Sequence, residues 1–271
     1  MLIFRYLFEQ CAKFLAHKDP RLQHLPFTSV GSFIIVVALY LFFVLKWGPN
    51  FMKNRRPYNL KPILLFYNAF QVFCNFSIFV YAIYQINMSG YKINYFCEEL
   101  DYSDSWIGTQ SAMGSYFYFL TKILDLLDTV FFVLRKRTRQ ISFLHVYHHM
   151  LVYVGGFAFI SMAPGGHLWL FAVLNLFVHI IMYSYYFGTV CSENLKTNIF
   201  IKRSITQMQI IQFVCTIIHL CLPFFVQDCG YPRSLLYVAI SQAVIMLLLF
   251  SDFYYKTYIK SKPNSPNVKS S

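Results

Sequence analysis

The sequence predicts an all-α integral membrane protein with seven transmembrane helices. Hydrophobic residues make up 57% of its 271 residues and charged residues only 13%, a balance that soluble domains of this size do not show. Uncharged segments of about 20 residues, the length at which a helix crosses a bilayer, recur along the chain. Basic residues follow every second one of these segments, as they do in the cytosolic loops of membrane proteins.

The elements begin with residues 1–26, a short mixed segment without a small-residue cleavage site, so we expect the first span to act as the targeting signal. Transmembrane helices are expected at about 28–46, 63–88, 112–135, 141–161, 167–189, 205–226 and 234–256. The fourth and fifth come from one uncharged run, residues 140–192, which Ala163-Pro164-Gly165-Gly166 divides because proline and glycine interrupt a helix. All seven belong to one membrane domain, residues 27–258, and residues 259–271 form a polar tail.

The basic residues also predict the orientation of the chain. The loops that follow the second and sixth spans hold only Lys92 and Arg233, whereas clusters of cations follow the first, third, fifth and seventh spans. By the positive-inside rule, the C-terminus is cytosolic and the N-terminus lumenal. The net charge of +12 then fits an anionic membrane surface and an anionic, phosphorylated substrate. No soluble module presents these cations, so we expect no nucleic-acid partner.

Two of the seven cysteines fall in loops that this topology places outside the cytosol. They are Cys97, between the second and third spans, and Cys229, between the sixth and seventh. An oxidising compartment permits a disulfide between them, but two separate thiols are an equally open alternative.

Polar residues in four consecutive spans recur at helical spacing. His145, His148 and His149 lie at i, i+3 and i+4 and share one face of the fourth span. The other three spans carry similar stripes: Lys122, Asp125, Asp128 and Thr129; Asn175, His179, Met182, Tyr183 and Tyr186; and Thr206, Gln209 and Gln212. A single polar residue in a membrane helix more often hydrogen-bonds to a neighbouring helix than binds a ligand, and the charges of Lys122 and Asp125 could simply neutralise each other. Four stripes at one depth near the cytosolic side instead predict a shared cavity, with an apolar remainder toward the lumen.

Three other classes of membrane protein fit this pattern less well. A di-iron desaturase needs several histidine clusters, but His17, His24, His167 and His219 lie away from the three imidazoles, so we expect no metal centre. A seven-span receptor would place its pocket on the outer side. A transporter would need polar residues or broken helices through to the lumen.

Four motifs resemble those of the elongation-of-very-long-chain-fatty-acids family, the condensing enzymes of the endoplasmic reticulum. His145-Val-Tyr-His-His149 matches its HxxHH box, and Lys122-Ile-Leu-Asp-Leu-Leu-Asp-Thr129 is similar to KxxExxDT, with Asp125 where the family usually has glutamate. The stretch from Asn175 to Tyr183 is similar to NxxxHxxMY, and the stretch from Thr206 to Gln212 to TxxQxxQ. An HxxHH box alone is weak evidence, but four boxes in this order are specific.

The resemblance implies a fold in which spans 2 to 7 form a six-helix barrel around a narrow tunnel, with span 1 packed outside. It implies condensation of a long-chain acyl-CoA with malonyl-CoA, which gives a 3-oxoacyl-CoA two carbons longer. It also implies the Cys97–Cys229 disulfide and residence in the endoplasmic reticulum membrane. No Gly-rich dinucleotide fingerprint occurs. We therefore expect no cofactor, and we expect the 3-ketoacyl-CoA reductase, dehydratase and enoyl reductase of the cycle to be partner enzymes; a homodimer is a further possibility.

The expected chemistry assigns a role to each stripe. We expect His148 to accept the acyl group, with His149, His145 and His179 orienting it or moving protons, because neutral imidazole can act as nucleophile or base at cytosolic pH; Cys191 is the rival nucleophile. Amides would stabilise developing oxyanions and cations would hold the CoA phosphates. The expected substrate-binding residues are Lys122, Asp125, Asp128, Asn175, Tyr183, Tyr186, Lys202, Thr206, Gln209 and Gln212, with Arg137 and Lys256 near the cytosolic mouth. The acyl chain length and unsaturation that are preferred cannot be read from the sequence.

Overall fold

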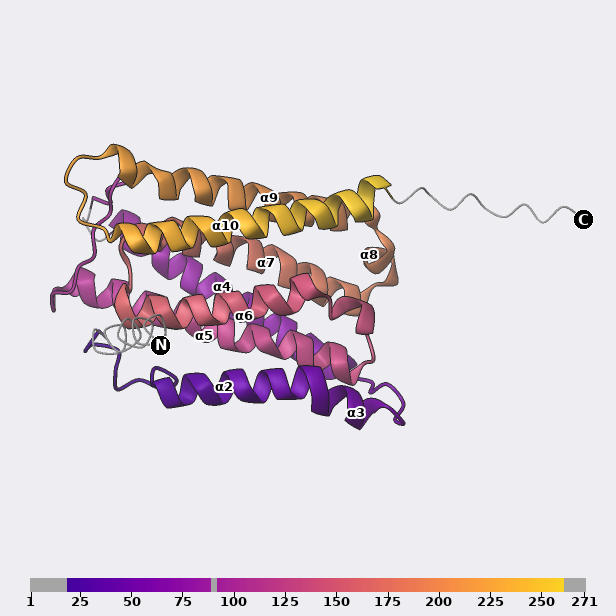
Figure 1. Ribbon diagram of the computed structural model, residues 1–271. Coiled ribbons are helices and arrows are strands. Elements are labelled where there is room, and N and C mark those ends of the chain that lie inside the picture. The colour runs from indigo at the N-terminus through magenta and orange to yellow at the C-terminus, as the bar shows by residue number, and fades with distance from the viewer. Residues whose placement is uncertain (1–18, 89–91, 261–271) are drawn as a thin grey trace, which may run out of the picture.

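The computed structural model describes residues 19–88 and 92–260, and within these ranges the chain is helical with no strand (Figure 1). Residues 1–18 of the predicted N-terminal segment and 261–271 of the predicted tail lie outside the described residues. The long elements are α2 (Val30–Phe42), which continues through η1 (Phe43–Trp47) into α3 (Gly48–Met52), then α4 (Lys61–Met88), α5 (Trp106–Leu134), α6 (Phe143–Met162), α7 (Trp169–Cys191), α9 (Ile199–Cys221) and α10 (Arg233–Tyr254). The short α8 (Glu193–Thr197) connects α7 to α9.

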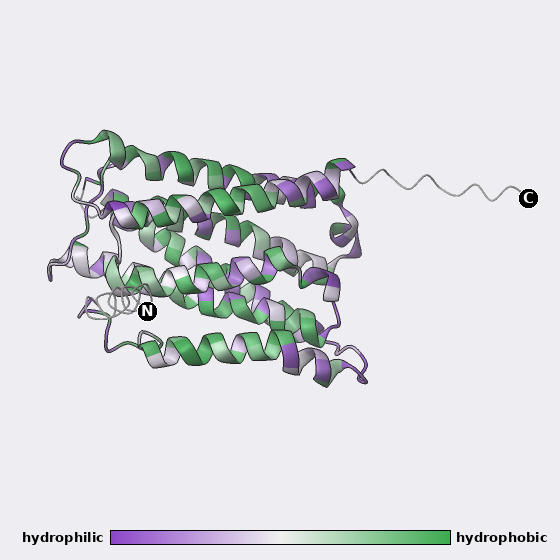
Figure 2. Ribbon diagram, in the orientation of Figure 1, coloured by the Kyte–Doolittle hydropathy of each residue, from purple (hydrophilic) through white to green (hydrophobic). Residues whose placement is uncertain are grey.

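Six of the described helices are long and apolar enough to cross a membrane, so the protein is a multi-pass membrane protein. Figure 2 shows hydrophobic residues along most of each helix and hydrophilic residues mainly at the ends. Helix α5, with 29 residues, is equally long but is not among the six, and it carries Lys122, Asp125 and Asp128 within two turns. The seventh span therefore stays a prediction.

Two helices begin about six residues before the expected start of their spans. Ser105 caps α5 by accepting a hydrogen bond from the Gly108 amide at 3.0 Å, and Asn198 caps α9 by accepting one from the Ile201 amide at 3.1 Å. Side-chain caps satisfy amides that lack a partner in the first turn. The spans were expected at 112 and 205 because apolar runs mark the bilayer core, whereas the helices continue into the polar flanks.

Six helices pack in the order required for a closed ring. Helix α4 packs on α5 and α7, α5 on α6, α6 on α10, α10 on α9, and α9 on α7, so each contacts two of the others. Helix α2 packs on α5 and α6, where the Phe33 ring stacks on Phe157 at a centroid distance of 4.4 Å. The expected barrel around a tunnel remains a prediction.

The turn between α6 and α7 is the break expected from the sequence. Helix α6 ends at Met162, and Gly165 and Gly166 have φ values of 92° and 61°. Residues with a Cβ rarely adopt these angles, so the two glycines let the chain reverse between the helices.

A disulfide joins Cys97, before α5, to Cys229, before α10, with a Cα–Cα separation of 5.9 Å. This is the bond expected from the resemblance. It closes a loop that contains α5, α6, α7 and α9. The Glu99 carboxylate accepts a hydrogen bond from the Gly230 amide at 2.9 Å beside the bond, which further ties together the loops at this end of the molecule.

Replacing Cys97 and Cys229 together by serine is expected to lower the free energy of unfolding by about 3 kcal/mol, because the bond restricts the unfolded chain. Thermal unfolding of the purified protein in detergent, with and without a reductant, measures the effect. The double variant should lose the dependence on reductant that the wild type shows. An unchanged midpoint in the variant would contradict the prediction.

Residues 19–29 form a strap across the same end of the molecule. Arg21 donates to the carbonyl oxygens of Ser103 at 2.8 Å and Asp101 at 3.0 Å, and it pairs with Asp19 at 2.6 Å. The Asp101 carboxylate accepts hydrogen bonds from the Ser103 hydroxyl at 2.6 Å and the Ser105 hydroxyl at 2.7 Å. These hydroxyl donors, with Arg21 nearby, lower the pKa of Asp101 below its usual value.

This carboxylate should make stability fall in acid. A lowered pKa in the folded state means that the contribution of Asp101 is complete above its unfolded pKa, near ~3.9, and is lost as the pH falls through the lower folded value. Asp101→Asn is expected to flatten this part of the profile. The measurement is the thermal midpoint of wild type and variant between about pH 6 and pH 3; parallel curves would contradict the assignment.

Candidate active site within the membrane domain

Helix α5 carries a buried charge cluster on the face it turns toward α4 and α7. The Lys122 side chain is 0% exposed, and its ammonium lies 2.9 Å from Asp125 Oδ2. Asp125 and Asp128 are also buried. One cation beside two carboxylates is costly to bury unless hydrogen bonds satisfy all three groups.

Side chains from α4 and α7 supply those hydrogen bonds. The Tyr183 hydroxyl lies 2.9 Å from Asp125 Oδ1 and 2.8 Å from Asp128 Oδ2, and Gln71 Nε2 donates to Asp125 Oδ1 at 2.8 Å. Asn175 Oδ1 accepts from Lys122 Nζ at 2.9 Å and from the Tyr118 hydroxyl at 3.0 Å. The structure thus brings together five of the predicted site residues: Lys122, Asp125, Asp128, Asn175 and Tyr183.

His179 joins this network at its edge. Its Nδ1 lies 3.5 Å from Asp125 Oδ2 and, although buried, has no hydrogen-bond partner among the residues that the structure describes. A buried imidazole nitrogen without a partner is uncommon in folded proteins. It is therefore available to a bound molecule.

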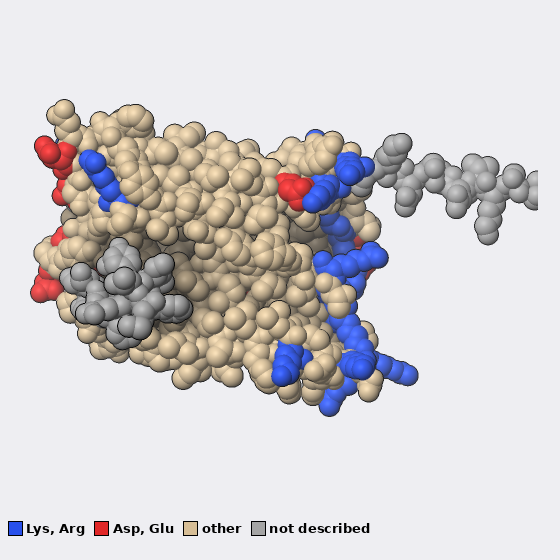
Figure 3. Space-filling view, viewed as in Figure 1, with Lys and Arg blue, Asp and Glu red and all other residues tan. Residues whose placement is uncertain are grey.

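The three histidines of α6 differ in their surroundings. His145 Nε2 lies 2.9 Å from the Thr129 hydroxyl, which lies 2.8 Å from the Tyr40 hydroxyl of α2. His149 is buried, its Nδ1 has no partner, and it lies within electrostatic range of His148, His179 and Lys122. His148 is only half-buried and faces the Phe250 ring of α10 at a centroid distance of 6.1 Å. The trio lies in the first two turns of α6, near the basic end of the molecule, where Lys and Arg gather at the helix ends (Figure 3).

The predicted residues of α9 and the basic loop stay outside the network. The Thr206 hydroxyl bonds to the Lys202 carbonyl of its own helix at 3.1 Å, and Gln209 Nε2 donates to the Met182 sulfur at 3.9 Å. Gln212 is buried and its Nε2 has no partner. Tyr186 is 36% exposed, and Lys202 is half-buried.

Several residues of the network were not predicted. Gln71 and Tyr67 of α4 touch Tyr183, at 3.2 and 3.5 Å, and Tyr118 and Tyr40 complete the contacts to Asn175 and Thr129. A signal existed for α4, because Asn68, Gln71 and Asn75 recur at offsets of 0, 3 and 7 in an otherwise apolar span. All three are buried. The tyrosines gave no such signal because tyrosine is common throughout this chain.

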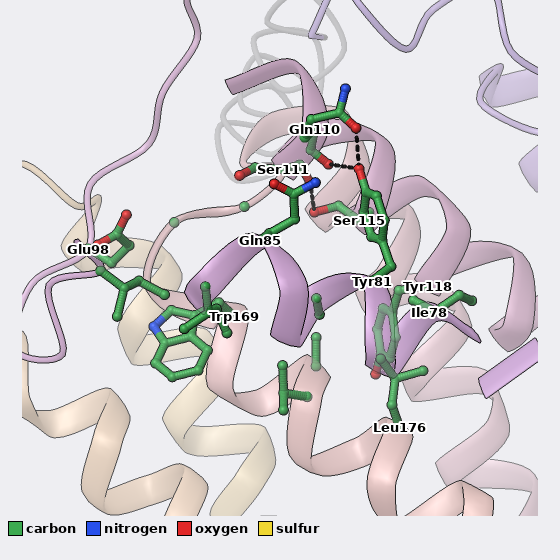
Figure 4. Close-up of a pocket in the computed structure, with 18 of the residues that line it drawn as sticks. Ile78, Tyr81, Gln85, Glu98, Gln110, Ser111, Ser115, Tyr118, Trp169 and Leu176 are labelled. Atoms are coloured by element: carbon green, nitrogen blue, oxygen red, sulfur yellow. Dashed lines mark hydrogen bonds between the residues drawn. The ribbon is translucent and has the colours of Figure 1, made fainter. Parts of the chain in front are cut away.

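A cavity lies beyond the network, toward the end that holds the disulfide. It is lined by residues of α4, α5 and α7 and by the Gly165–Gly166 turn (Figure 4). Tyr118 and Leu176 line one end of it and Gln110 and Ser111 the other. The Tyr118 hydroxyl bonds to Asn175, so its ring stands between the cavity and the charge cluster.

Comparison with known proteins places the chain in a family. The model of the ELO family, described as the GNS1/SUR4 family, matches residues 25–266, which include every helix from α2 to α10. The chain belongs to the ELO family. Among similar ELO proteins, the very long chain fatty acid elongase 7 of Drosophila melanogaster is 37% identical over 89% of this chain and 73% of its own length. The very long chain fatty acid elongase 7 of Rattus norvegicus is 36% identical over 90% of this chain and 87% of its own length. The elongase 4 of Homo sapiens is 37% identical over 92% of this chain and 78% of its own length.

The residues that match the ELO family model include those of the candidate site. The four motifs that suggested the family lie within the matched residues, and three of them, on α5, α6 and α7, are the ones that the structure brings together. The fourth, on α9, contributes Gln212 with a free amide donor.

Proposed function

We propose that this protein is a fatty acid elongase that catalyses decarboxylative condensation of a long-chain acyl-CoA with malonyl-CoA. Elongase relatives at 36–37% identity over most of the chain support the elongation of fatty acids. The observation that carries the finer reaction is the meeting of two histidine-bearing helices with the buried charges of α5: His179 Nδ1 lies 3.5 Å from Asp125 Oδ2, and His145 of the α6 trio bonds to Thr129. Such a site combines nucleophile, base and fixed charge at one depth.

In the proposed first half-reaction, His148 takes the acyl group. Its imidazole nitrogen attacks the thioester carbonyl, the carbon–sulfur bond breaks, and CoA leaves as a thiolate that takes up the imidazole proton. His148 suits this role because its side chain is half-buried, whereas that of His149 is buried, and because no hydrogen bond to the described residues holds it. His145 is held by Thr129, which favours a positioning role.

In the second half-reaction, malonyl-CoA loses carbon dioxide to give an enolate. The enolate attacks the acyl carbonyl, a carbon–carbon bond forms, and the bond to the His148 nitrogen breaks; the nitrogen takes up one proton from solvent, which restores the neutral imidazole. Asn175 Oδ1 is occupied by Lys122 and Tyr118, so the amide group of Asn175 is left to donate to the developing oxyanion. The free Nε2 of Gln212 is a second donor.

The Lys122–Asp125–Tyr183 network gives the site its rigidity. Fixed dipoles that need no reorganisation stabilise a charge as it forms. In this proposal the charge of Lys122 balances those of the two aspartates, and Lys122 lies too deep to reach a CoA phosphate. The cations of the basic end, including Lys202, Arg137 and Lys256, would bind the CoA phosphates instead. These cations would also face the cytosol in the endoplasmic reticulum membrane, with the N-terminus lumenal.

The proposal is tested by incubating membranes that contain the protein with malonyl-CoA and a panel of acyl-CoAs. The expected result is a 3-oxoacyl-CoA two carbons longer for a subset of chain lengths. Membranes from the same cells without the protein are the control for endogenous enzymes. Equal extension in both membranes for every acyl-CoA would contradict the proposed function. The reductase and dehydratase steps would belong to partner enzymes, so the 3-oxo product should accumulate without them.

A further inference from the structure

Helices α6 and α10 meet along the least extensive contact of the six-helix ring. We call this contact the α6–α10 seam. Near the basic end it is joined by a hydrogen bond of 2.9 Å from the Tyr147 hydroxyl to Gln242 Oε1 and by the contact of His148 with Phe250. Both belong to the part of α6 that carries the histidines. Further along, α10 buries little of its surface: only Leu236, Ala243 and Met246 are buried in its 22 residues.

The seam is hollow at Gly155. A Cβ on Gly155 would meet no atom within 4 Å, and the residue is exposed, as is the neighbouring Val154 at 42%. Figure 3 shows the surface hollowed in this region, between the helices that Figure 1 labels α6 and α10. Gly155 follows His148 by seven residues and therefore lies on the same face of α6, about 10 Å along the helix. Ala243 of α10, seven residues before Phe250, is another small residue.

We propose that this hollow is a lateral opening through which the acyl chain of the substrate passes between the bilayer and His148. The inference rests on the proposed function, because it names the path of that substrate. Gly155 lies on the same face of α6 as the half-buried His148, and the hollow beside it lies on the surface of a protein that spans the membrane.

The chemistry of the substrate favours this path over entry from the end of the molecule. Each CH₂ group of an acyl chain is stabilised by burial in the bilayer. Threading it through the basic end would first withdraw those groups from hydrocarbon and pass them among lysines and arginines. Sideways movement through the α6–α10 seam keeps the chain in an apolar medium, while the CoA phosphates stay at the basic end.

The first test fills the opening. In protein reconstituted into phosphatidylcholine vesicles, Gly155→Phe is expected to lower kcat/KM for a long-chain acyl-CoA by about ten-fold or more, and that for the shortest accepted acyl-CoA by no more than about two-fold. Gly155→Ala should stay within about two-fold of wild type for both, because the hollow accepts a methyl group. An equal loss for every chain length, or no loss, would overturn the lateral opening.

The second test does not require that Gly155→Phe fold. Gly155→Cys is reconstituted and treated with a bulky maleimide that partitions into the bilayer, with wild type as the control for the native cysteines. The expected result is rapid alkylation followed by the same selective loss for long chains. A cysteine that the reagent does not reach, or alkylation that leaves long-chain turnover intact, would refute the opening. If wild type extends no acyl-CoA at all, the proposed function itself fails; if wild type is active and these variants keep its profile, only the opening fails.

Discussion

Replacement of His148 by alanine is expected to lower the rate of condensation at least about a thousand-fold, equivalent to about 4 kcal/mol of transition-state stabilisation. The reason is that this imidazole would both accept the acyl group and release it to the enolate. His145→Ala is expected to have a smaller effect, because that ring hydrogen-bonds to Thr129, which in turn bonds to Tyr40, and acts by positioning.

The measurement that separates these roles is covalent labelling. Protein mixed with radiolabelled acyl-CoA, without malonyl-CoA, is denatured and counted; wild type and His145→Ala should retain label, and His148→Ala should not. Cys191→Ala is the matched control for the rival nucleophile. Cys191 is exposed at the last residue of α7, eight residues beyond Tyr183 or about 12 Å along the helix, so the variant should keep both label and activity. An inactive Cys191→Ala, or an active His148→Ala, would reverse the assignment.

Replacement of Lys122 by methionine is expected to lower the free energy of unfolding by about 3 to 5 kcal/mol, because it leaves a buried carboxylate without its counter-ion. Lys122 is 0% exposed and pairs with Asp125 at 2.9 Å. Asp128 is buried beside them, so the loss would leave two carboxylates sharing the hydrogen bonds of Tyr183. Thermal unfolding in detergent, followed by size-exclusion chromatography, gives the change in stability.

The matched control is the double variant Lys122→Met, Asp125→Leu. Removal of both charges of a buried pair is often close to neutral for stability. The double variant should therefore recover much of the stability that the single variant loses, yet remain inactive if the network is needed to hold Asn175 and His179. Equal loss in the two variants would show that Lys122 acts through packing alone. Asp125→Glu, which restores the residue usual in the family, should keep the ion pair.

The site could be predicted where its residues share one helix. The stripe from Lys122 to Thr129 and the three histidines of α6 follow from helical spacing and from the cost of polar groups in a bilayer. In the structure His145 of α6 bonds to Thr129 of the α5 stripe, and the roles of these residues stay predictions. The Cys97–Cys229 pairing required the family resemblance, because loop position alone left two thiols equally open.

Contacts between helices set the limit of such prediction. That Tyr40 of α2 reaches Thr129, or that Tyr118 rather than another of the 21 tyrosines bonds to Asn175, depends on helix rotations that periodicity does not fix. Gln209 shares a stripe with Gln212, and its amide lies 3.9 Å from the Met182 sulfur of α7, a partner that the spacing alone does not identify. A stripe gives the face of a helix but not its partner.

The Cys97–Cys229 bond has a consequence for how the chain matures. Cys229 follows α9, so it leaves the ribosome only after every histidine of the site has been synthesised. Oxidation of the pair can therefore occur only on a chain in which α5 to α9 are already present. The presence of the bond therefore shows that the chain has been synthesised past Cys229. A nascent chain arrested before residue 229 keeps a free thiol at Cys97 and can be distinguished by it.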